Sequence, residues 1–211
     1  MPDKEINFLK ALYSVAEDLN TEREPEGVLQ SITEDVTEAM GVKGCSLILL
    51  SSDKKTLLHT ATYGLSEAYL GKGPLLAQKS ICEALLGKVV TILDSKNDSR
   101  VQFPELKESE GIASILSVPM KLRGEIIGVV RVYTAEKHEF TEDEIDFVQA
   151  AANLGAIALE NIRLYATVKK DYDELRQEML EWRTSMAGTP RSMWFMRHSR
   201  DQHLPGNPRT K

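Results

Sequence analysis

An arginine in the middle of an apolar strand is the strongest chemical signal in the sequence. Alternation along residues 125–135 places Ile126, Val130 and Val132 on one face and Ile127 and Val129 on the other. A strand that is apolar on both faces is expected to be covered on both sides. Arg131 shares its face with Tyr133 in this pattern. Because a buried guanidinium without a partner is costly, Arg131 must reach an anionic or carbonyl acceptor.

Two kinds of partner for Arg131 are consistent with the sequence. The first is a carboxylate or carbonyl of the terminal helices, where acids are abundant, if this strand face looks toward them. The second is the carboxylate or phosphate of a small anionic ligand on the floor of a pocket, with Tyr133 adding a hydrogen bond. The candidate residues for the apolar wall of that pocket are Tyr63, Ile81, Leu85, Phe103 and Leu116, with Leu47 or Leu49.

Other chemistries lack a residue set. Cys45 and Cys82 form no C-x-x-C pair and are expected to be reduced. His59 falls on a predicted strand and His138 at a helix entrance, and neither belongs to a convincing set of metal ligands. The stretch "GLSEAYLGKG" lacks the spacing of a phosphate-binding loop, and no G-x-S-x-G nucleophile motif occurs. We therefore expect no catalytic residue, no metal and no cofactor.

Composition and charge limit the possible settings. The chain has 211 residues, 42% hydrophobic and 27% charged, with a net charge of −6. It has no apolar run long enough to cross a bilayer, and its start lacks the apolar core of a signal peptide, so we expect a cytoplasmic protein. Residues 183–211 carry six basic residues and one acid, which leaves an acidic body unsuited to nucleic acid. We expect this basic tail to be disordered, with docking of its "MWFM" cluster on a partner or membrane surface as the alternative.

The elements that would position Arg131 follow an α+β order. Two helices are predicted first, over residues 4–20 and from about 25 to 40, the second with a Thr21–Glu24 capping box. The apolar stripe of the first helix is Ile6, Leu9, Tyr13, Ala16 and Leu19. A hairpin of residues 44–52 and 56–64, an irregular middle and strands at 117–122 and 125–135 come next. A capping box of Thr141 and Glu144 then begins a helix predicted to reach Trp182.

The second half of this last helix carries a heptad-like apolar seam. The seam residues are Tyr165, Val168, Tyr172, Leu175, Met179 and Trp182. Forty residues at 1.5 Å rise make a helix of roughly 60 Å, longer than one domain needs for its core. Such a seam requires a partner helix, and we expect a parallel homodimer through helices 4–20 and 141–182.

Residues 111–165 carry a distributed motif: "GIASILSVPMKLRGEIIGVVRVYTAEKHEFTEDEIDFVQAAANLGAIALENIRLY". The chain resembles the GAF domain family in its S-x-L-x-V-P, G-x-x-I-G-V and A-I-A-L-E-N patterns. The matching positions are Ser114, Leu116, Val118, Pro119, Gly124, Ile127, Gly128, Val129, Phe140 and Ala156 to Asn161.

The resemblance implies a central antiparallel sheet of about six strands, with terminal helices on one face and ligand-pocket loops on the other. It divides the chain into a dimerisation helix (1–20), a GAF domain (21–165), a coiled-coil extension (166–182) and the basic tail (183–211). A strand that is apolar on both faces is expected in such a fold, because one face packs against the helices and the other forms the floor of the pocket.

The implied function is a small-molecule sensor in signal transduction, which passes the ligand state through a helical dimer to a separate signalling protein. The cyclic-nucleotide motif N-K-x-x-F-D-E is absent, and neither cysteine lies in a bilin-attachment motif or a cysteine cluster like that of free methionine sulfoxide reductases. No output domain is recognised after residue 165, so we expect the output to be a partner protein, a change in the protein's own dimer, or the capture of the ligand itself. The alternative is an interaction or scaffold protein whose pocket is closed and binds no ligand.

Overall fold

The computed structural model of the chain describes residues 2–21, 25–51, 53–71, 73, 75–77 and 82–187. Residues Met1–Arg163 form one compact unit and Leu164–Lys211 a second. Three features named in the sequence analysis lie wholly or partly outside the described residues. They are Ile81, the Thr21–Glu24 capping box and residues 188–211 of the basic tail. The predictions made for them therefore stay predictions.

Six antiparallel strands form the sheet of the first unit, in the order β3-β2-β1-β6-β5-β4. These are β1 (Gly44–Leu50), β2 (Thr56–Tyr63), β3 (Leu75–Leu76), β4 (Val90–Ile92), β5 (Ser114–Leu122) and β6 (Glu125–Thr134). The predicted hairpin and the two long strands are confirmed as β1–β2 and β5–β6. Strands β1 and β6, distant in sequence, pair at the centre of the sheet. The expected α+β fold with about six strands is confirmed.

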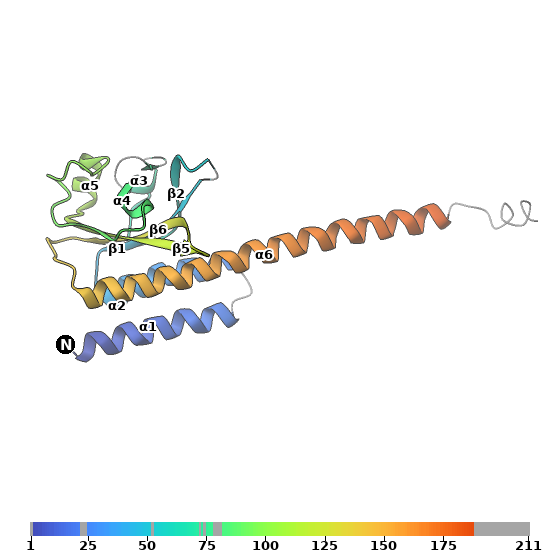
Figure 1. Cartoon of the computed structure of the whole chain (residues 1–211), viewed down its shortest axis with the longest axis horizontal. Coiled ribbons are helices and arrows are strands. Elements are labelled where there is room, and N and C mark those ends of the chain that lie inside the picture. The colour runs from blue at the N-terminus through green and yellow to red at the C-terminus, as the bar shows by residue number, and fades with distance from the viewer. Residues whose placement is uncertain are drawn as a thin grey trace, which may run out of the picture. The chain divides into compact units, whose positions relative to one another are not determined.

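Helices cover both faces of this sheet (Figure 1). On one face, α2 (Pro25–Met40) and the first half of α6 (Glu142–Ala187) lie against the sheet, and α1 (Pro2–Thr21) lies outside them. The short helices α3 (Glu67–Leu70), α4 (Cys82–Leu85) and α5 (Pro104–Glu110) lie on the other face. Helix α3 and strand β3 fall in the middle region, where the sequence showed no regular pattern.

Each face of the sheet has its own core. The helix-side core contains Ile32, Leu47, Leu116, Val130 and Val132, together with residues of α1 and α6. The loop-side core comprises twelve buried residues: Ile48, Leu57, Tyr69, Leu75, Ala77, Ala84, Val90, Ile92, Ile112, Ile115, Val129 and Tyr133. The sheet is thus buried on both sides, as its apolar strands predict.

The start of α6 confirms the predicted capping box. The Glu144 amide donates to Thr141 Oγ1 at 3.3 Å, and the Thr141 amide donates to Glu144 Oε2 at 3.0 Å. Glu144 Oε2 also contacts His138 Nε2 at 2.8 Å. These reciprocal bonds satisfy amides that a helix N-terminus would otherwise leave unpaired. The helix continues to Ala187, five residues beyond its predicted end at Trp182.

The buried stripe of α1 differs from the predicted one. Phe8 and Val15 are buried, and the Phe8 ring stacks on Phe147 of α6 with centroids 4.3 Å apart. Ile6, Leu9 and Tyr13, three residues of the predicted apolar stripe, are 49 to 70% exposed. The helix therefore has two apolar stripes, and periodicity alone did not show which one meets the domain.

A bulge exchanges the faces of two β6 residues. Between Met120 and Lys121 the pairing with β6 moves from Gly128 to Ile126, which leaves Ile127 as the extra residue. Ile127 consequently packs against the helix-side core, and Ile126 lies beside Gly87 after α4. The sequence-based assignment of Ile126 to the Val130 face and Ile127 to the Arg131 face was wrong, because one inserted residue reverses the alternation.

Candidate functional site

Arg131 faces the loop side of the sheet. Its neighbours two positions away, Val129 and Tyr133, belong to the loop-side core, whereas Val130 and Val132 belong to the helix-side core. Successive side chains of a strand point to opposite faces, so Arg131 points away from the terminal helices. Its side chain is fully buried. The terminal helices cover the opposite face of the sheet. The carboxylates and carbonyls of these helices, which the sequence allowed as partners of Arg131, are therefore not on the side to which Arg131 points.

A row of polar side chains crosses the sheet at Arg131. Ser46 of β1 and Ser117 of β5 are the residues paired with Arg131, and both are fully buried. Arg131 Nε donates to Ser117 Oγ at 3.0 Å. Ser46 Oγ lies 2.6 Å from Nδ1 of the half-buried His59 on β2. The row from His59 to Ser117 therefore places polar groups from four strands within the loop-side face.

Two buried tyrosines stand above this row. Tyr69 and Tyr133 meet edge-to-face with ring centroids 6.1 Å apart, and Tyr69 meets His59 in the same manner at 6.4 Å. Burial raises the pKa of both tyrosines, and the nearby Arg131 guanidinium only partly opposes this rise in pKa. Both hydroxyls are therefore neutral near pH 7. The Tyr133 hydroxyl lies close to the side chains of Tyr69 and Arg131, but it makes no hydrogen bond of ordinary geometry within the described part of the chain.

Local contacts of α3 position Tyr69. Ser66 caps the helix, and its Oγ accepts a hydrogen bond from the Tyr69 amide at 3.2 Å. The amide of Ser66 donates to Glu110 Oε1 at 3.0 Å, and its hydroxyl donates to Glu110 Oε2. Lys43 Nζ lies 3.6 Å from the same carboxylate. These contacts connect the α3 cap to the end of α5 and hold Tyr69 over the sheet.

The structure brings together only part of the predicted site. Arg131 and Tyr133 share the loop-side face, and the half-buried Leu85 packs against the same core. Leu116 lies instead in the helix-side core, as does Leu47, while Leu49 packs against that core. Tyr63 pairs with Cys45, another helix-side residue, so it shares the face opposite Arg131.

Tyr63 lies on the opposite face of the sheet from the predicted one because β2 contains a second β-bulge. The pairing of β1 and β2 shifts between Leu47 and Ile48, whose partners are Ala61 and His59. Thr60 is the extra residue, and the alternation of β2 reverses there. Tyr69, Ser46 and Ser117, which sequence reasoning did not select, take part in the site. The one available signal was the presence of small polar residues within otherwise apolar strands.

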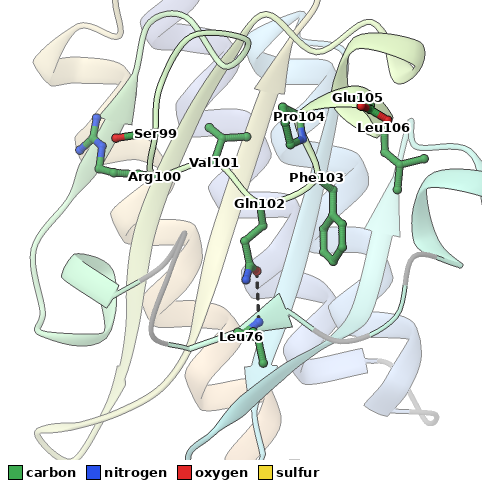
Figure 2. A pocket seen from close by; sticks show the side chains of 9 residues that line it. All are labelled: Leu76, Ser99, Arg100, Val101, Gln102, Phe103, Pro104, Glu105 and Leu106. Carbon is green, nitrogen blue, oxygen red and sulfur yellow. Dashed lines mark hydrogen bonds between the residues drawn. The ribbon is translucent and has the colours of Figure 1, made fainter.

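Phe103, which was also predicted to form the apolar wall of the pocket, instead lines a hollow away from Arg131. It is 39% exposed and has a positive φ of 55° at the start of α5. The hollow has a volume of about 830 Å³ and lies against the edge strand β3 (Figure 2). Its lining residues are Leu76, Ser99, Arg100, Val101, Gln102, Phe103, Pro104, Glu105 and Leu106. Arg131 and Tyr133 take no part in it.

Backbone contacts of one loop shape this hollow. Gln102 Oε1 accepts from the Leu76 amide at 3.1 Å, and Figure 2 shows the Gln102 side chain reaching down to β3. Behind it, the buried Lys107 donates from Nζ to the Gln102 carbonyl at 3.0 Å. Arg100 contributes to the rim but is already bonded to Asp98 at 2.6 Å. Five of its nine lining residues are apolar, and the side chains of Gln102 and Arg100 already bond within the chain.

No group of three or more His, Cys, Asp or Glu able to hold a metal occurs among the described residues. Burial raises the pKa of the Cys45 thiol to about 12, which makes it unreactive, whereas Cys82 is exposed. Over the same described part of the chain, we find no helix with the length and apolar content needed to span a membrane.

Comparison with known proteins decides the family. A model described as "GAF domain" matches residues 22–160. The chain belongs to the GAF domain family. The GAF domain of a phosphoenolpyruvate-protein phosphotransferase from Coxiella burnetii superposes with a TM-score of 0.68 and 23% identity, covering 77% of this chain and 98% of that one. The resemblance inferred from the motif at residues 111–165 is thereby confirmed.

Relatives of this GAF domain include both a sensor and an enzyme. Sensor histidine kinase YhcY of Bacillus subtilis (strain 168) is 23% identical over 171 residues, covering 78% of this chain and 45% of the kinase. Free methionine-R-sulfoxide reductase of Neisseria meningitidis superposes with a TM-score of 0.65 and 17% identity, covering 77% of this chain and 94% of that one. This chain spans less than half the length of the kinase. The likeness to the reductase shows the fold alone.

Proposed function

We propose that this GAF domain senses a small anionic molecule, which binds on the loop side of the sheet against Arg131. The observation that carries the proposal is the position of Arg131: fully buried, on the face away from the terminal helices, beside Tyr133 on the same strand and close to Tyr69. A buried cation in an apolar interior is retained at a cost in stability. A bound carboxylate or phosphate would use it directly.

In this proposal three polar groups of the cluster have roles in ligand binding. The guanidinium of Arg131 makes two hydrogen bonds to the anion. Ser117, which accepts a hydrogen bond from Nε at 3.0 Å, fixes the orientation of the guanidinium plane. The Tyr133 hydroxyl, neutral and without a well-formed bond within the described residues, donates to a second ligand oxygen. Apolar residues of the loop-side core exclude water and strengthen these contacts.

The site binds but does not catalyse in this account. Two neutral tyrosines, two serines and an arginine offer hydrogen bonds to an anion. Ser46 Oγ lies within reach of a general base, 2.6 Å from His59 Nδ1, but in this account the contact of the fully buried Ser46 with His59 is structural. The relatives that are sensors, such as the histidine kinase, favour signal transduction. The proposed output passes through pairing of two copies to a separate signalling protein in the cytoplasm.

Exposed apolar side chains support the pairing step. On α1 these are Ile6, Leu9 and Tyr13. On α6 the six seam residues from Tyr165 to Trp182 are all more than half exposed. Large exposed apolar patches of this kind are found at interaction surfaces. We infer a homodimer through these helices.

A closed scaffold is the second candidate. The twelve residues of the loop-side core are packed and buried, and the 830 Å³ hollow lies away from Arg131. On this reading Arg131 and its serines are internal structure, and the protein acts only through its surfaces.

Thermal shift assays with matched arginine variants separate the two candidates. The wild type, Arg131→Met and the exposed control Arg123→Met are melted with phosphate, sulfate, small mono- and dicarboxylates and nucleotides. Arg123 is an exposed arginine on the β5–β6 turn that pairs with Glu160 at 2.8 Å. The sensor proposal predicts that at least one anion stabilises the wild type and Arg123→Met, and that Arg131→Met loses this shift.

The melting temperature without ligand gives the second criterion. A ligand anchor that is replaced by Met leaves stability unchanged or raised, because a buried charge is removed. If Arg131→Met melts several degrees lower and no anion shifts the wild type, Arg131 is structural and the closed scaffold is the better account.

A further inference from the structure

Arg131 is fully buried, so a small molecule from solvent can reach it only if part of the domain moves. Strand pairing on both sides holds β6 in place. The layer over the loop side consists of short helices, and α3 contributes the buried Tyr69. Its ring meets that of Tyr133, two residues along β6 from Arg131, with centroids 6.1 Å apart. Burial raises the pKa of the Tyr69 hydroxyl and the charge of Arg131 opposes that rise, as expected of two side chains that lie close together. Tyr69 therefore covers the Arg131 site from the side of α3.

The segment that carries Tyr69 is too short to be stable by itself. Helix α3 spans four residues, Glu67–Leu70, fewer than an isolated helix needs. Gly64 precedes it with a φ of 75°, and Gly73 follows it with a φ of 86°. Glycine adopts such conformations without strain, so the backbone can turn on both sides of the helix. The contacts of α3 with its surroundings therefore decide whether it stays in place.

The carboxylate of Glu110 holds the start of this segment. Ser66 donates to it twice, from its amide to Oε1 at 3.0 Å and from its hydroxyl to Oε2. Lys43 Nζ lies 3.6 Å from Oε1. Burial acts to raise the pKa of Glu110, but the hydrogen bonds from Ser66 and the charge of Lys43 hold this pKa below its usual range. The carboxylate is therefore ionised near pH 7, and it fixes the Ser66 hydroxyl that accepts from the Tyr69 amide at 3.2 Å.

A hollow beside the segment reaches the outer end of the row of polar side chains. It has a volume of about 310 Å³ and lies between Leu70 and Gly73 on one side and the outer part of β2 on the other. Its lining includes His59, whose Nδ1 lies 2.6 Å from Ser46 Oγ. Ser46 in turn is the β1 residue paired with Arg131. Polar groups thus lead from this hollow to the buried guanidinium.

We propose that residues 64–71 form a lid over the Arg131 site, closed by Tyr69 and entered from the hollow beside β2. Glu110 is the positioning residue that holds this lid shut through Ser66. When the lid opens, the contacts between Ser66 and Glu110 separate and Tyr69 leaves the loop-side core. The inference rests on the proposed function for the nature of the ligand, and it specifies how access to the site is regulated.

Phenylglyoxal, a reagent that modifies arginine side chains, tests the lid without a ligand. The modification rate of each arginine in the full chain is followed by peptide mass spectrometry, with the exposed Arg123 as the internal reference. Glu110→Ala should raise the rate at Arg131 by about tenfold or more, because the lid opens more often. Glu108→Ala is the matched control. It removes an exposed carboxylate of the same helix, which pairs with Lys96, and should change the rate by less than about twofold.

Two measurements separate lid opening from global unfolding, which would also expose Arg131. Urea denaturation gives the equilibrium constant for folding, and the lid predicts that Arg131 is protected relative to Arg123 by a much smaller factor than this constant. Hydrogen exchange should become faster in residues 64–71 of Glu110→Ala while the amides of β6 keep their protection. Ser66→Ala, which removes one of the two hydrogen bonds to Glu110, is a milder second variant and should raise the Arg131 rate by about threefold.

Blocking the hollow tests the entrance. Thr60→Cys, in a Cys82→Ser background that removes the exposed thiol, places a reactive group in the lining of the hollow. Attaching a bulky maleimide there should slow the modification of Arg131 by about fivefold or more. The same treatment of Thr91→Cys, an exposed position on the opposite edge strand β4, should leave the rate unchanged. The remaining thiol, Cys45, is buried and does not react.

The results that would overturn the lid differ from those that would overturn the proposed function. An Arg131 rate that is unchanged in both Glu110→Ala and Ser66→Ala, or that only follows the free energy of unfolding, would overturn the lid. A rate that is unaffected by the maleimide on Thr60→Cys would overturn the entrance. The sensor proposal is contradicted instead if no anion shifts the melting temperature of the wild type, whatever the reactivity of Arg131.

Discussion

Replacing Tyr133 by Phe should stabilise the ligand-free protein. The ring is fully buried in the loop-side core, and its hydroxyl lacks a well-formed hydrogen bond within the described part of the chain. A buried hydroxyl without a compensating bond costs about 1–3 kcal/mol in mutational data. Phe retains the ring and its edge-to-face contact with Tyr69, so little packing is lost.

The expected change follows from this cost. Removing the hydroxyl should raise the free energy of unfolding by about 1–3 kcal/mol. For a chain of this size each kcal/mol shifts the melting temperature by roughly 2–4 °C, so the shift should be roughly 2–12 °C upward. Urea denaturation gives the free energy and calorimetry gives the melting temperature, both on ligand-free protein. Tyr13→Phe, in which the tyrosine is 70% exposed, is the control and should change the free energy by less than about 0.5 kcal/mol.

The same variant should bind an anion more weakly, since Tyr133 is proposed to donate to it. A variant that gains stability but loses binding is expected when a residue is kept for binding although it lowers the stability of the ligand-free protein. If Tyr133→Phe instead lowers the free energy of unfolding by 1 kcal/mol or more, its hydroxyl is bonded in the ligand-free protein and the reasoning fails.

Three further predictions concern the sheet, the surface charges and the seam. Gly128→Ala should lower the free energy of unfolding in urea by about 1–3 kcal/mol or more, because its Cβ would lie 2.4 Å from the Ile48 carbonyl oxygen; an unchanged midpoint would contradict this. The hydrogen bond from Lys137 holds the pKa of Asp94 at about 2, so its contribution to stability is present above pH about 4 and is lost as the pH falls toward 2. Melting curves against pH should therefore fall less steeply over that window for Asp94→Asn than for the wild type, and parallel curves would argue against the pair. Leu175→Lys places a charge within the exposed seam and should give a monomer by sedimentation at concentrations where the wild type pairs; undiminished pairing would exclude the seam as the interface.

Much of the fold could be predicted because local signals agreed with one another. The Thr141–Glu144 box specified where α6 begins, and its reciprocal bonds are present. The alternation of residues 125–135 correctly placed Arg131 and Tyr133 on one face. It could not tell which layer covers that face, because both layers bury apolar side chains and period-two alternation is the same for either.

Some site residues were assigned to the wrong face of the sheet or overlooked, because a single sequence does not show the structural features that place them. The extra residues at Thr60 and Ile127 reverse alternation within a strand. No Gly or Pro stands next to Thr60, whereas Gly128 follows Ile127 directly and is consistent with either a bulge or a close backbone approach. Leu116 was assigned to the pocket although its own neighbours in β5 alternate between two apolar faces. Tyr69 was missed because α3 has four residues, too few for periodicity to reveal.

Native mass spectrometry of the full chain, purified from its own host, tests the sensing of a small molecule at Arg131 most directly. The account predicts that the wild type carries a discrete small-molecule adduct, released on denaturation and detected as an anion, and that Arg131→Met prepared in the same way carries none while Arg123→Met retains it. A wild type free of any adduct, together with no anion that restores one on incubation, would contradict the account, as would an adduct that persists undiminished in Arg131→Met.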